Sequence, residues 1–435
     1  MEDKIKNLMK NKFRWLILIV VILVIILLIN ATRKIGPAQI GGPEIPDGAG
    51  QKGSPIKDGP EIPEANQANG ERQKSDLPSC GNKMDFFTVS PIKSEDYGDL
   101  IPLGNLNPTG HVFPTDHIYL FSKNTPDNGR ASEALAKPLY SPGDMWITQI
   151  STSEDIGTKI TDYSISYQPC ADFKGQFGHV GRLSAKLKSE IEKITEEKCN
   201  DYTTGGSKYR ACRYDQLKIF VKAGEELGTV FNGRSAALDI WATDFRIEKL
   251  KFANPDHWRE ESFYNACPAN YFTESIKNEM LGRFSSYERN KKRTIEPVCG
   301  TTEVDIKGTA KGHWFPSDFT VNMSEDRNMA LVNDNRSPLL QAFSMGNSGE
   351  NKGYKSGVNF FAPKNSGNVN RDFAEVKSDG NVYCYETLDS RDGRGQKAVL
   401  YLNMPNGETV RVEKSNRSTC GQGPWIMENY VEFVR

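Results

Sequence analysis

The longest run of hydrophobic residues lies near the start of the chain. Every residue from Trp15 to Ile29 is apolar, and basic residues between Lys4 and Arg14 precede the run. As a helix it is short for a bilayer core of about 30 Å, but its flanking residues extend it. No small-residue cleavage signal follows the run, so we predict an uncleaved transmembrane signal anchor over 15–30; the alternative is a cleaved signal peptide. The excess of Lys and Arg before it predicts a cytoplasmic tail over 1–14 and an extracytoplasmic remainder.

Polar residues, Gly and Pro dominate residues 31–79. The string GPEIP occurs twice there, at 42–46 and at 59–63. Such a segment cannot bury enough apolar surface to offset the entropy of ordering it. We therefore predict an extended linker that lets the rest of the chain reach away from the membrane, with partner binding by the repeat as the alternative.

Short runs of β-branched and aromatic residues, bounded by turn residues, follow Cys80. They predict strands over 117–121, 145–151, 163–167, 217–221 and 236–242. One segment differs, because Leu183, Leu187, Ile191 and Ile194 recur at helical spacing and predict an amphipathic helix over 183–198. The pattern over 80–250 is that of a β-domain with a helical insertion.

The last part of the chain returns to a strand pattern after a short helical one. Residues 251–299 are predicted to form a bridge with a helix over 273–284, and residues 300–435 an all-β domain. Predicted strands there are 329–332, 339–343, 358–361, 382–385, 398–404 and 409–412. Asn406-Gly407 is a hairpin signal, and such a meander should close as an antiparallel barrel or sandwich to protect its edges.

Aromatic residues are frequent in this C-terminal domain. They are Trp314, Phe315, Phe360, Phe361, Tyr383, Tyr385 and Trp425. We predict that they fill the core of the domain; stacking on sugars or lining a lipid cavity are the alternatives. We recognise no family for this domain.

All eight cysteines follow the hydrophobic run. An even number on that side suits disulfides formed in an oxidising compartment, and no CxxC pair suggests a zinc ribbon or redox motif. Eight cysteines allow 105 connectivities. Closing each predicted unit separately favours the pairs Cys80–Cys170, Cys199–Cys212, Cys267–Cys299 and Cys384–Cys420.

The balance of charges argues against nucleic-acid binding. The 55 Lys and Arg residues nearly cancel the 56 Asp and Glu residues, so the chain has no global positive field to attract nucleic acid. The sequence also lacks a GxSxG elbow, an HExxH helix and a Walker loop.

Four segments between about residues 105 and 245 occur in an order known from one enzyme family. They are 110–117 (GHVFPTDH), 178–183 (GHVGRL), 221–228 (VKAGEELG) and 236–240 (AALDI). Together they resemble the lysostaphin-type, LytM-like zinc endopeptidases of bacterial cell walls. The resemblance implies a duplicated hybrid β-fold over 80–250. It also implies metal ligands in 110–117, a catalytic role for His179, and a metal motif at 237–239.

The metal motif of this family is altered here. The family's His-x-His is Ala237-Leu-Asp239, so a carboxylate replaces one ligand and the neighbouring His is lost. The family's His and Asp are four residues apart, whereas His111 and Asp116 are five apart, which places them on opposite faces of a regular strand unless Pro114 bends it. Zinc hydrolases need three protein ligands and an open position for water.

Strand parity provides a second set of candidates. His117 alternates with aliphatic residues in one predicted strand, and Asp239 does so in another, so both should face the same groove, with His179 beside them. The candidate metal ligands are therefore His111, Asp116, His117 and Asp239, and the candidate catalytic residue is His179. No cofactor is expected, and a bound zinc ion is the alternative. The alternative is that these side chains only hydrogen-bond nearby loops.

Three functions are compatible with these patterns. The altered metal motif favours a non-catalytic relative of the endopeptidases that binds an envelope polymer or a protein partner. An active zinc peptidoglycan endopeptidase with Asp239 as the substitute ligand is the second. A structural or lipid-handling envelope protein is the third.

Overall fold

The computed structural model describes residues 76–125, 131–194, 198–204, 207–285, 291–321, 323–388 and 397–435. The predicted cytoplasmic tail, the anchor, both GPEIP strings and most of the linker lie outside these residues. No helix in the described part of the chain is both long and apolar enough to cross a membrane.

The protein is mainly β, as its pattern predicts, and its first sheet is the larger. That sheet contains β1 (Tyr97–Ile101), β2 (His117–Ser122), β3 (Lys137–Tyr140), β4 (Met145–Asp155), β5 (Thr161–Cys170), β6 (Phe173–Leu183), β7 (Lys198–Thr204), β8 (Ser207–Tyr214), β9 (Ile219–Val221), β10 (Glu226–Val230) and β11 (Ala237–Asp244).

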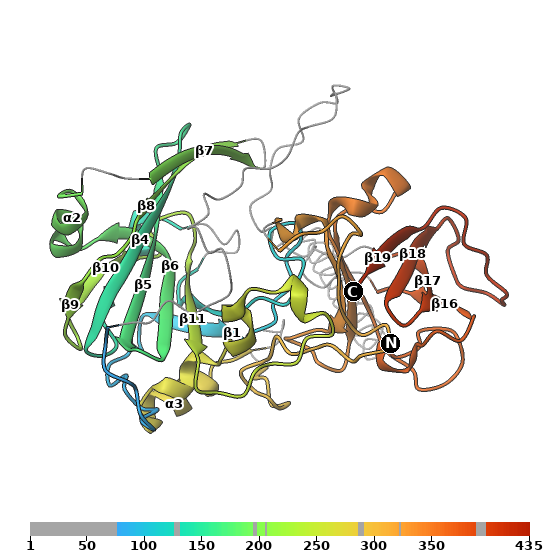
Figure 1. Ribbon diagram of the computed structural model, residues 1–435, viewed down its shortest axis with the longest axis horizontal. Coiled ribbons are helices and arrows are strands. Elements are labelled where there is room, and N and C mark those ends of the chain that lie inside the picture. Colours follow the sequence, from blue (N-terminus) through green and yellow to red (C-terminus); the bar gives the residue numbers. More distant parts are fainter. Residues whose placement is uncertain are drawn as a thin grey trace, which may run out of the picture. The chain divides into compact units, whose positions relative to one another are not determined.

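These strands form one antiparallel sheet in the order β1-β2-β11-β6-β5-β4-β8-β7, with β10 joining β3 to β6 and β9 pairing with β4. Figure 1 shows β4, β5, β6 and β11 running side by side as its body. Aliphatic and aromatic side chains such as Ile118, Ile165, Phe177 and Ile240 alternate toward one buried cluster. This alternation carries polar side chains of the same strands to the opposite face.

The helix predicted over 183–198 is shorter than its periodicity suggests. Leu183 belongs to β6, where it pairs with Gly228 of β10, and the helix α2 runs only over Ala185–Ile191. The Ser184 hydroxyl accepts a hydrogen bond from the Leu187 backbone N–H and thereby caps the first turn. Leu183, the first of the four periodic residues, is therefore part of a strand, and Ile194, the last, lies beyond the end of the helix.

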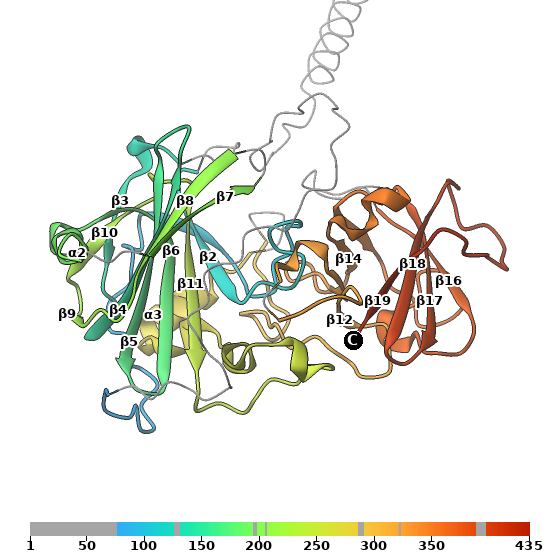
Figure 2. The ribbon, with the colours of Figure 1, turned by 45° about the horizontal axis from the view of Figure 1, so that its top comes forward.

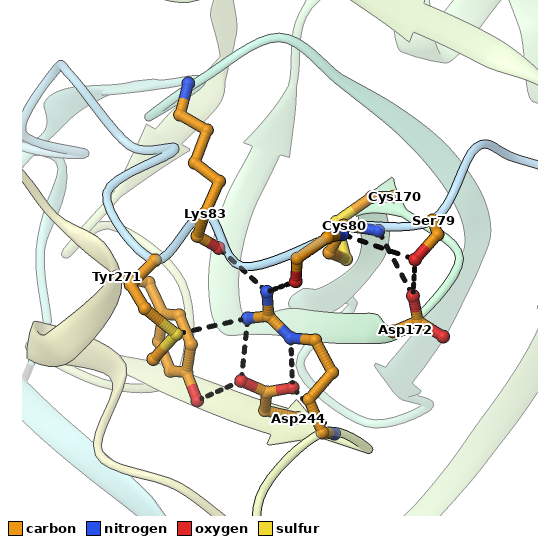
Figure 3. The surroundings of a disulfide bond; sticks show 10 residues. Ser79, Cys80, Lys83, Cys170, Asp172, Asp244 and Tyr271 are labelled. Carbon is orange, nitrogen blue, oxygen red and sulfur yellow. Dashed lines mark hydrogen bonds and ion pairs between the residues drawn. A yellow bond between two sulfur atoms is a disulfide. The ribbon is translucent and has the colours of Figure 1, made fainter.

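The beginning of the described chain is fastened to the sheet. Cys80 forms a disulfide with Cys170 at the end of β5, and the Cys80 backbone N–H and the Ser79 hydroxyl both donate to Asp172. Figure 3 shows this bridge beside Asp172. The segment that follows the linker is thus held covalently and by a carboxylate.

Residues 251–299 connect the two β regions. They contain the 3-10 helices η2 (Pro255–His257), η3 (Glu260–Tyr264) and η4 (Pro268–Tyr271) and the helix α3 (Glu274–Leu281). The end of this segment covers the edge of β1, because the Leu100 N–H donates to Arg283 and the Ser285 N–H donates to Leu100. An outer strand whose backbone groups are paired in this way is protected from edge-to-edge association.

Two smaller sheets form the C-terminal region. One contains β12 (Gly312–Trp314), β13 (Met329–Asn333), β14 (Gln341–Met345) and β15 (Gly357–Phe361), and the other β16 (Val382–Glu386), β17 (Val399–Asn406), β18 (Thr409–Ser415) and β19 (Val431–Val434). The 3-10 helices η5 (Glu325–Arg327), η6 (Asn347–Lys352) and η7 (Phe373–Glu375) also belong to this region, whereas η1 (Glu133–Leu135) lies between β2 and β3. Figure 2 shows β16, β17 and β18 side by side.

The two C-terminal sheets are linked at both of their edges. Phe315 after β12 pairs with Val434 of β19, and Phe360 of β15 pairs with Leu388 after β16. The predicted core aromatics Trp314, Phe315, Phe360, Phe361, Tyr383 and Tyr385 are buried, whereas Trp425 is half-buried against the Cys384–Cys420 cluster. Closing the edges and filling the interior agree with the predicted meander that protects its own edges.

Four disulfides join the cysteines in the favoured pairing. They are Cys80–Cys170, Cys199–Cys212, Cys267–Cys299 and Cys384–Cys420, and no cysteine is free among the described residues. Each bridge closes one structural unit, which is why separate closure of the predicted units identified the pairs. Four such bridges are typical of a protein that folds in an oxidising, extracytoplasmic environment.

Candidate functional site

Two neighbouring strands carry the candidate polar residues on one face. β11 pairs with β2 so that Asp239 lies opposite Tyr119 and Trp241 lies opposite His117. The aliphatic residues between them point into the core on the other face. The prediction from strand parity that His117 and Asp239 share a face is therefore confirmed. Both side chains are nevertheless buried, with exposed fractions of 2% and 4%.

His179 reaches the same face from β6 through an irregular backbone. Its φ is 58°, in the left-handed region that residues other than Gly rarely adopt. The register of β6 shifts here against both β5 and β10, so the strand carries extra residues at a bulge. Neighbouring Gly178 is required sterically, because a Cβ there would lie 2.8 Å from the ring of Trp241. The bulge redirects the His179 imidazole toward β11.

Asp239 is the point at which the two imidazoles converge. Its Oδ2 lies 3.3 Å from His179 Nε2 and 3.6 Å from His117 Nε2. Burial raises the pKa of Asp239, and the neighbouring histidines oppose this rise. We refer to His117, His179 and Asp239 as the histidine centre.

The second nitrogen of His179 is also held by a carboxylate. Its Nδ1 lies 2.7 Å from Oδ2 of Asp162, a residue of β5. Burial lowers the pKa of His179, but the carboxylates of Asp239 and Asp162 outweigh it and raise the pKa to about 9. Both ring nitrogens thus face carboxylate oxygens, an arrangement that favours the protonated imidazolium.

His117 is oriented by Asp116. Its Nδ1 lies 3.1 Å from Asp116 Oδ1, which also accepts a hydrogen bond of 2.8 Å from the Trp241 indole. Desolvation raises the pKa of Asp116, but these hydrogen bonds outweigh it and lower the pKa below its usual value. The Asp116 carboxylate thus holds the outer nitrogen of His117 and the Trp241 indole together.

His111 lies beside the histidine centre but is paired with a residue outside it. Its ring lies 5.3 Å from the ring of His117, but its Nδ1 is 3.5 Å from Glu325 at the start of η5. Residues 110–116 form a loop before β2, which begins at His117 as predicted. The backbone of this loop is held elsewhere: the Phe113 N–H donates to Glu325, and Val112 accepts from Ser344.

Several buried polar atoms at the centre have no hydrogen-bond partner among the described residues. They are His117 Nε2, Asp162 Oδ1 and Asp239 Oδ1. A buried polar atom without a partner costs about 1–3 kcal/mol. Three such atoms close together call for an explanation, and a functional site is one.

The candidate ligands lie close together but are not identified as a metal site. Among the described residues, no three or more His, Cys, Asp and Glu side chains are arranged to hold a metal ion. Of the candidate ligands, His117 and Asp239 come together, Asp116 contacts the other ring nitrogen of His117, and His111 interacts with Glu325.

Sequence reasoning missed two residues beside the centre. Asp162 holds His179, and Arg234, in the turn between β10 and β11, acts on the pKa of His179 by lowering it. Neither belongs to a motif. In β5, Asp162 and the buried Ile165 lie on opposite faces of the strand, so alternation could have predicted that Asp162 points away from the core. The bulge in β6 that brings His179 to Asp162 has no recognisable sequence pattern.

A separate cleft of about 440 Å³ lies next to the Cys80–Cys170 bridge. Its lining includes Lys83, Phe86, Asp144 and Pro169. Figure 3 shows Lys83 to the left of this bridge, with Asp244 and Tyr271 below Lys83. None of the residues of the histidine centre lines this cleft.

Fold and site together define a class: a disulfide-bonded, mainly β extracytoplasmic protein with a buried histidine–aspartate centre on its larger sheet. The chain matches no protein-family model, no curated protein and no solved structure.

Proposed function

We propose that this chain is a membrane-tethered extracytoplasmic protein whose larger β-domain binds a cell-envelope polymer or protein partner without cleaving it. In this proposal the domain over 80–250 is a non-catalytic relative of the lysostaphin-type endopeptidases. The hydrophobic run over 15–30 is its anchor, and residues 31–79 are the spacer. The four disulfides support an extracytoplasmic domain.

One observation carries the non-catalytic part. His179 stands between Asp162 and Asp239, at 2.7 Å and 3.3 Å from their oxygens. In a zinc hydrolase a bound water is activated by the metal and a nearby base takes up its proton. An imidazolium already carries its proton and cannot serve as that base. Asp239 in turn is engaged by His179, so the residue that replaces the family's metal motif has an internal partner.

A second observation supports binding. Tyr119 and Trp241 lie on the same face as Asp239, and 33% of the His179 side chain is exposed. Aromatic rings beside a polar side chain suit peptides and sugars.

The test combines a binding and a metal measurement on the full-length protein purified in a mild detergent. We expect it to sediment with purified peptidoglycan, to leave the peptide cross-links intact, and to contain zinc far below one equivalent. His179→Asn should reduce co-sedimentation, because it removes the charge at the centre. His257→Asn is the matched control, since this residue lies in η2, in a different part of the fold.

Two outcomes would overturn the proposal in different ways. One equivalent of zinc that disappears in Asp239→Asn, together with cross-link cleavage, would establish the endopeptidase alternative. A correctly folded protein that fails to sediment with wall polymer and captures no envelope protein would favour the structural or lipid-handling alternative.

A further inference from the structure

The larger sheet ends in a strand that is paired on one side only. β7 is the last strand in the order of that sheet, and its one pairing among the described strands is with β8, without a register shift (Figure 1). The strand at the opposite end of the order, β1, is covered: the Leu100 N–H donates to Arg283, and the Ser285 N–H donates to Leu100. β7 therefore presents an uncovered edge, which is a template for a further strand.

The hydrogen bonds of β8 show which backbone groups of β7 face outward. The Ile156 N–H, just beyond β4, donates to Lys208 of β8, so every second residue from Lys208 directs its backbone groups toward β4. Cys212 is one of these residues, and its partner Cys199 therefore forms no ladder bond with it. Their Cα separation of 4.1 Å agrees with a pair that is not hydrogen-bonded, for which about 4.5 Å is usual. The residues of β7 that direct their N–H and C=O groups away from β8 are thus Cys199, Asp201 and Thr203.

These outward groups are without partners, and the strand that carries them is held in place. Among the described residues, none of the three has a backbone hydrogen bond on its outer side. The Cys199–Cys212 disulfide joins the two strands of the hairpin, and the Tyr202 hydroxyl lies 2.9 Å from Ser153 Oγ of β4. An edge that is rigid before binding loses less conformational entropy when a partner arrives.

The spacing of these groups selects the chemistry of a partner. Outward-facing residues of one strand are about 7 Å apart, because a strand rises about 3.4 Å per residue. Each of them offers one N–H donor and one C=O acceptor. An extended polypeptide repeats its own donors and acceptors at the same interval, and the addition of such a segment to an exposed sheet edge is a known mode of recognition.

Charge argues against a second copy of β7 as the partner. With antiparallel pairing and full overlap, Asp201 would lie opposite Asp201 of the second copy, and this side chain, 3.6 Å from Arg210 of β8, is 63% exposed. Like charges directly opposite each other destabilise a pair of strands. Lys198 is 68% exposed, and an exposed lysine on an edge discourages association between copies. A foreign strand with a basic residue opposite Asp201 is the better match.

We propose that β7 is a docking edge for an extended segment of a partner protein, which joins the larger sheet as a further strand with a basic residue opposite Asp201. The inference goes beyond the proposed function. It uses the backbone groups of β7 and none of the residues of the histidine centre, so it does not depend on binding to wall polymer.

Fluorescence anisotropy of a labelled peptide on the full-length protein, in a mild detergent, tests the docking edge. The probe is acetyl-Thr-Val-Thr-Lys-Thr-Val-Thr-amide. We expect it to bind, and we expect the same peptide methylated on the backbone nitrogens of its three central residues to bind at least about tenfold more weakly, because it lacks the donors of the ladder. A peptide with Glu in place of Lys should bind about threefold more weakly. Failure of the probe to bind, or equal binding of either altered peptide, overturns the inference.

Two variants at one position provide the matched control on the protein. Asp201→Asn keeps the outward N–H and removes the charge, whereas Asp201→Pro also removes the N–H, which the pairing with β8 does not use. We expect Asp201→Pro to bind the probe at least about tenfold more weakly than Asp201→Asn does. Equal affinities of the two variants would contradict the inference. If the proline variant does not fold, the methylated peptide decides.

Sedimentation velocity identifies the occupant. We expect the wild type and Asp201→Pro to have the same oligomeric state. A wild-type dimer that Asp201→Pro abolishes would show that a second copy occupies the edge and would refute docking of a foreign strand.

The docking edge and the proposed function fail separately. A protein that binds the probe but does not sediment with peptidoglycan would retain the docking edge and lose the wall-binding function. A protein that sediments with peptidoglycan but does not bind the probe would lose the docking edge alone.

Discussion

Two regions of the molecule each contain a buried histidine beside an aspartate, and the two pairs differ in how completely they are satisfied. In the C-terminal region, His313 Nδ1 lies 2.9 Å from Asp305 Oδ1, with exposed side-chain fractions of 1% and 3%. The same aspartate accepts hydrogen bonds of 2.7 Å from the backbone of His313 and of Ala253. Neither oxygen of Asp305 lacks a partner.

On the larger sheet, the hydrogen bonding of His179 and its two aspartates is incomplete. Asp162 and Asp239 each have one buried oxygen without a partner, and 33% of the His179 side chain is exposed. Aromatic rings enclose His313, with Phe113, Trp258 and Phe252 centroids at 4.6, 4.7 and 5.7 Å. The same residue types therefore stabilise the fold where both carboxylate oxygens are paired, and indicate a site where one is not.

The largest effect is expected at the satisfied pair. His313→Ala leaves Asp305 buried without its imidazole partner, and losing one member of a buried pair costs about 3–5 kcal/mol. Urea unfolding of the full-length protein at pH 7 measures this loss. His257→Ala, at a half-buried histidine with no carboxylate partner among the described residues, is the control and should cost less. A loss below about 1 kcal/mol for His313→Ala would remove the distinction between the two pairs.

An intermediate, pH-dependent effect is expected at His179. Its folded-state pKa of about 9 exceeds the value of 6.5 for a free histidine. Because the folded pKa is the higher one, the stabilisation is complete below about pH 6.5 and is lost as the pH rises through 9. With 33% of the side chain exposed, we expect a decline of about 1–2 kcal/mol over this range.

His179→Gln should flatten this decline, because glutamine does not titrate. Urea unfolding at four pH values between 6 and 10 provides the comparison, and His111→Gln should keep the wild-type slope. An unchanged slope in His179→Gln would mean that the two aspartates do not hold the imidazolium in the folded state.

The smallest effect is expected at a surface pair. His111 Nδ1 lies 3.5 Å from Glu325, and both side chains are partly exposed, at 37% and 30%. Exposed pairs contribute about 0–1 kcal/mol, and a glutamine can still accept the hydrogen bond from the Phe113 backbone. Glu325→Gln should therefore change the free energy of unfolding by less than about 0.5 kcal/mol. A larger change would show that the loop over 110–116 depends on this charge.

Local patterns predicted much of the fold. Strands at 117–121, 145–151, 163–167 and 236–242 lie within β2, β4, β5 and, apart from its first residue, β11. The alternation of polar and aliphatic residues also predicted that His117 and Asp239 share a face, because side-chain direction in a strand follows from a period of two. The disulfide pairs followed from closing each unit separately.

Other features depend on exceptions to these periods. His179 itself has a left-handed backbone at the β6 bulge, and this conformation turns its side chain toward Asp239. The two-residue period of a regular strand does not predict such a conformation. The helix predicted over 183–198 was too long because pairing with β10 claims Leu183. His111 was expected near the metal ligands, and a residue more than 200 positions away, Glu325, determines where it lies.

Composition and neighbours along the chain were enough to predict the strand-rich character of the chain, the extracytoplasmic setting indicated by its cysteines, and the face shared by His117 and Asp239. Contacts between distant strands determine which histidine is held by two carboxylates and place Arg234 beside them. Those contacts join β4, β5, β6, β8 and β11. Side chains from five strands meet only after the sheet has formed, and no local period encodes their meeting.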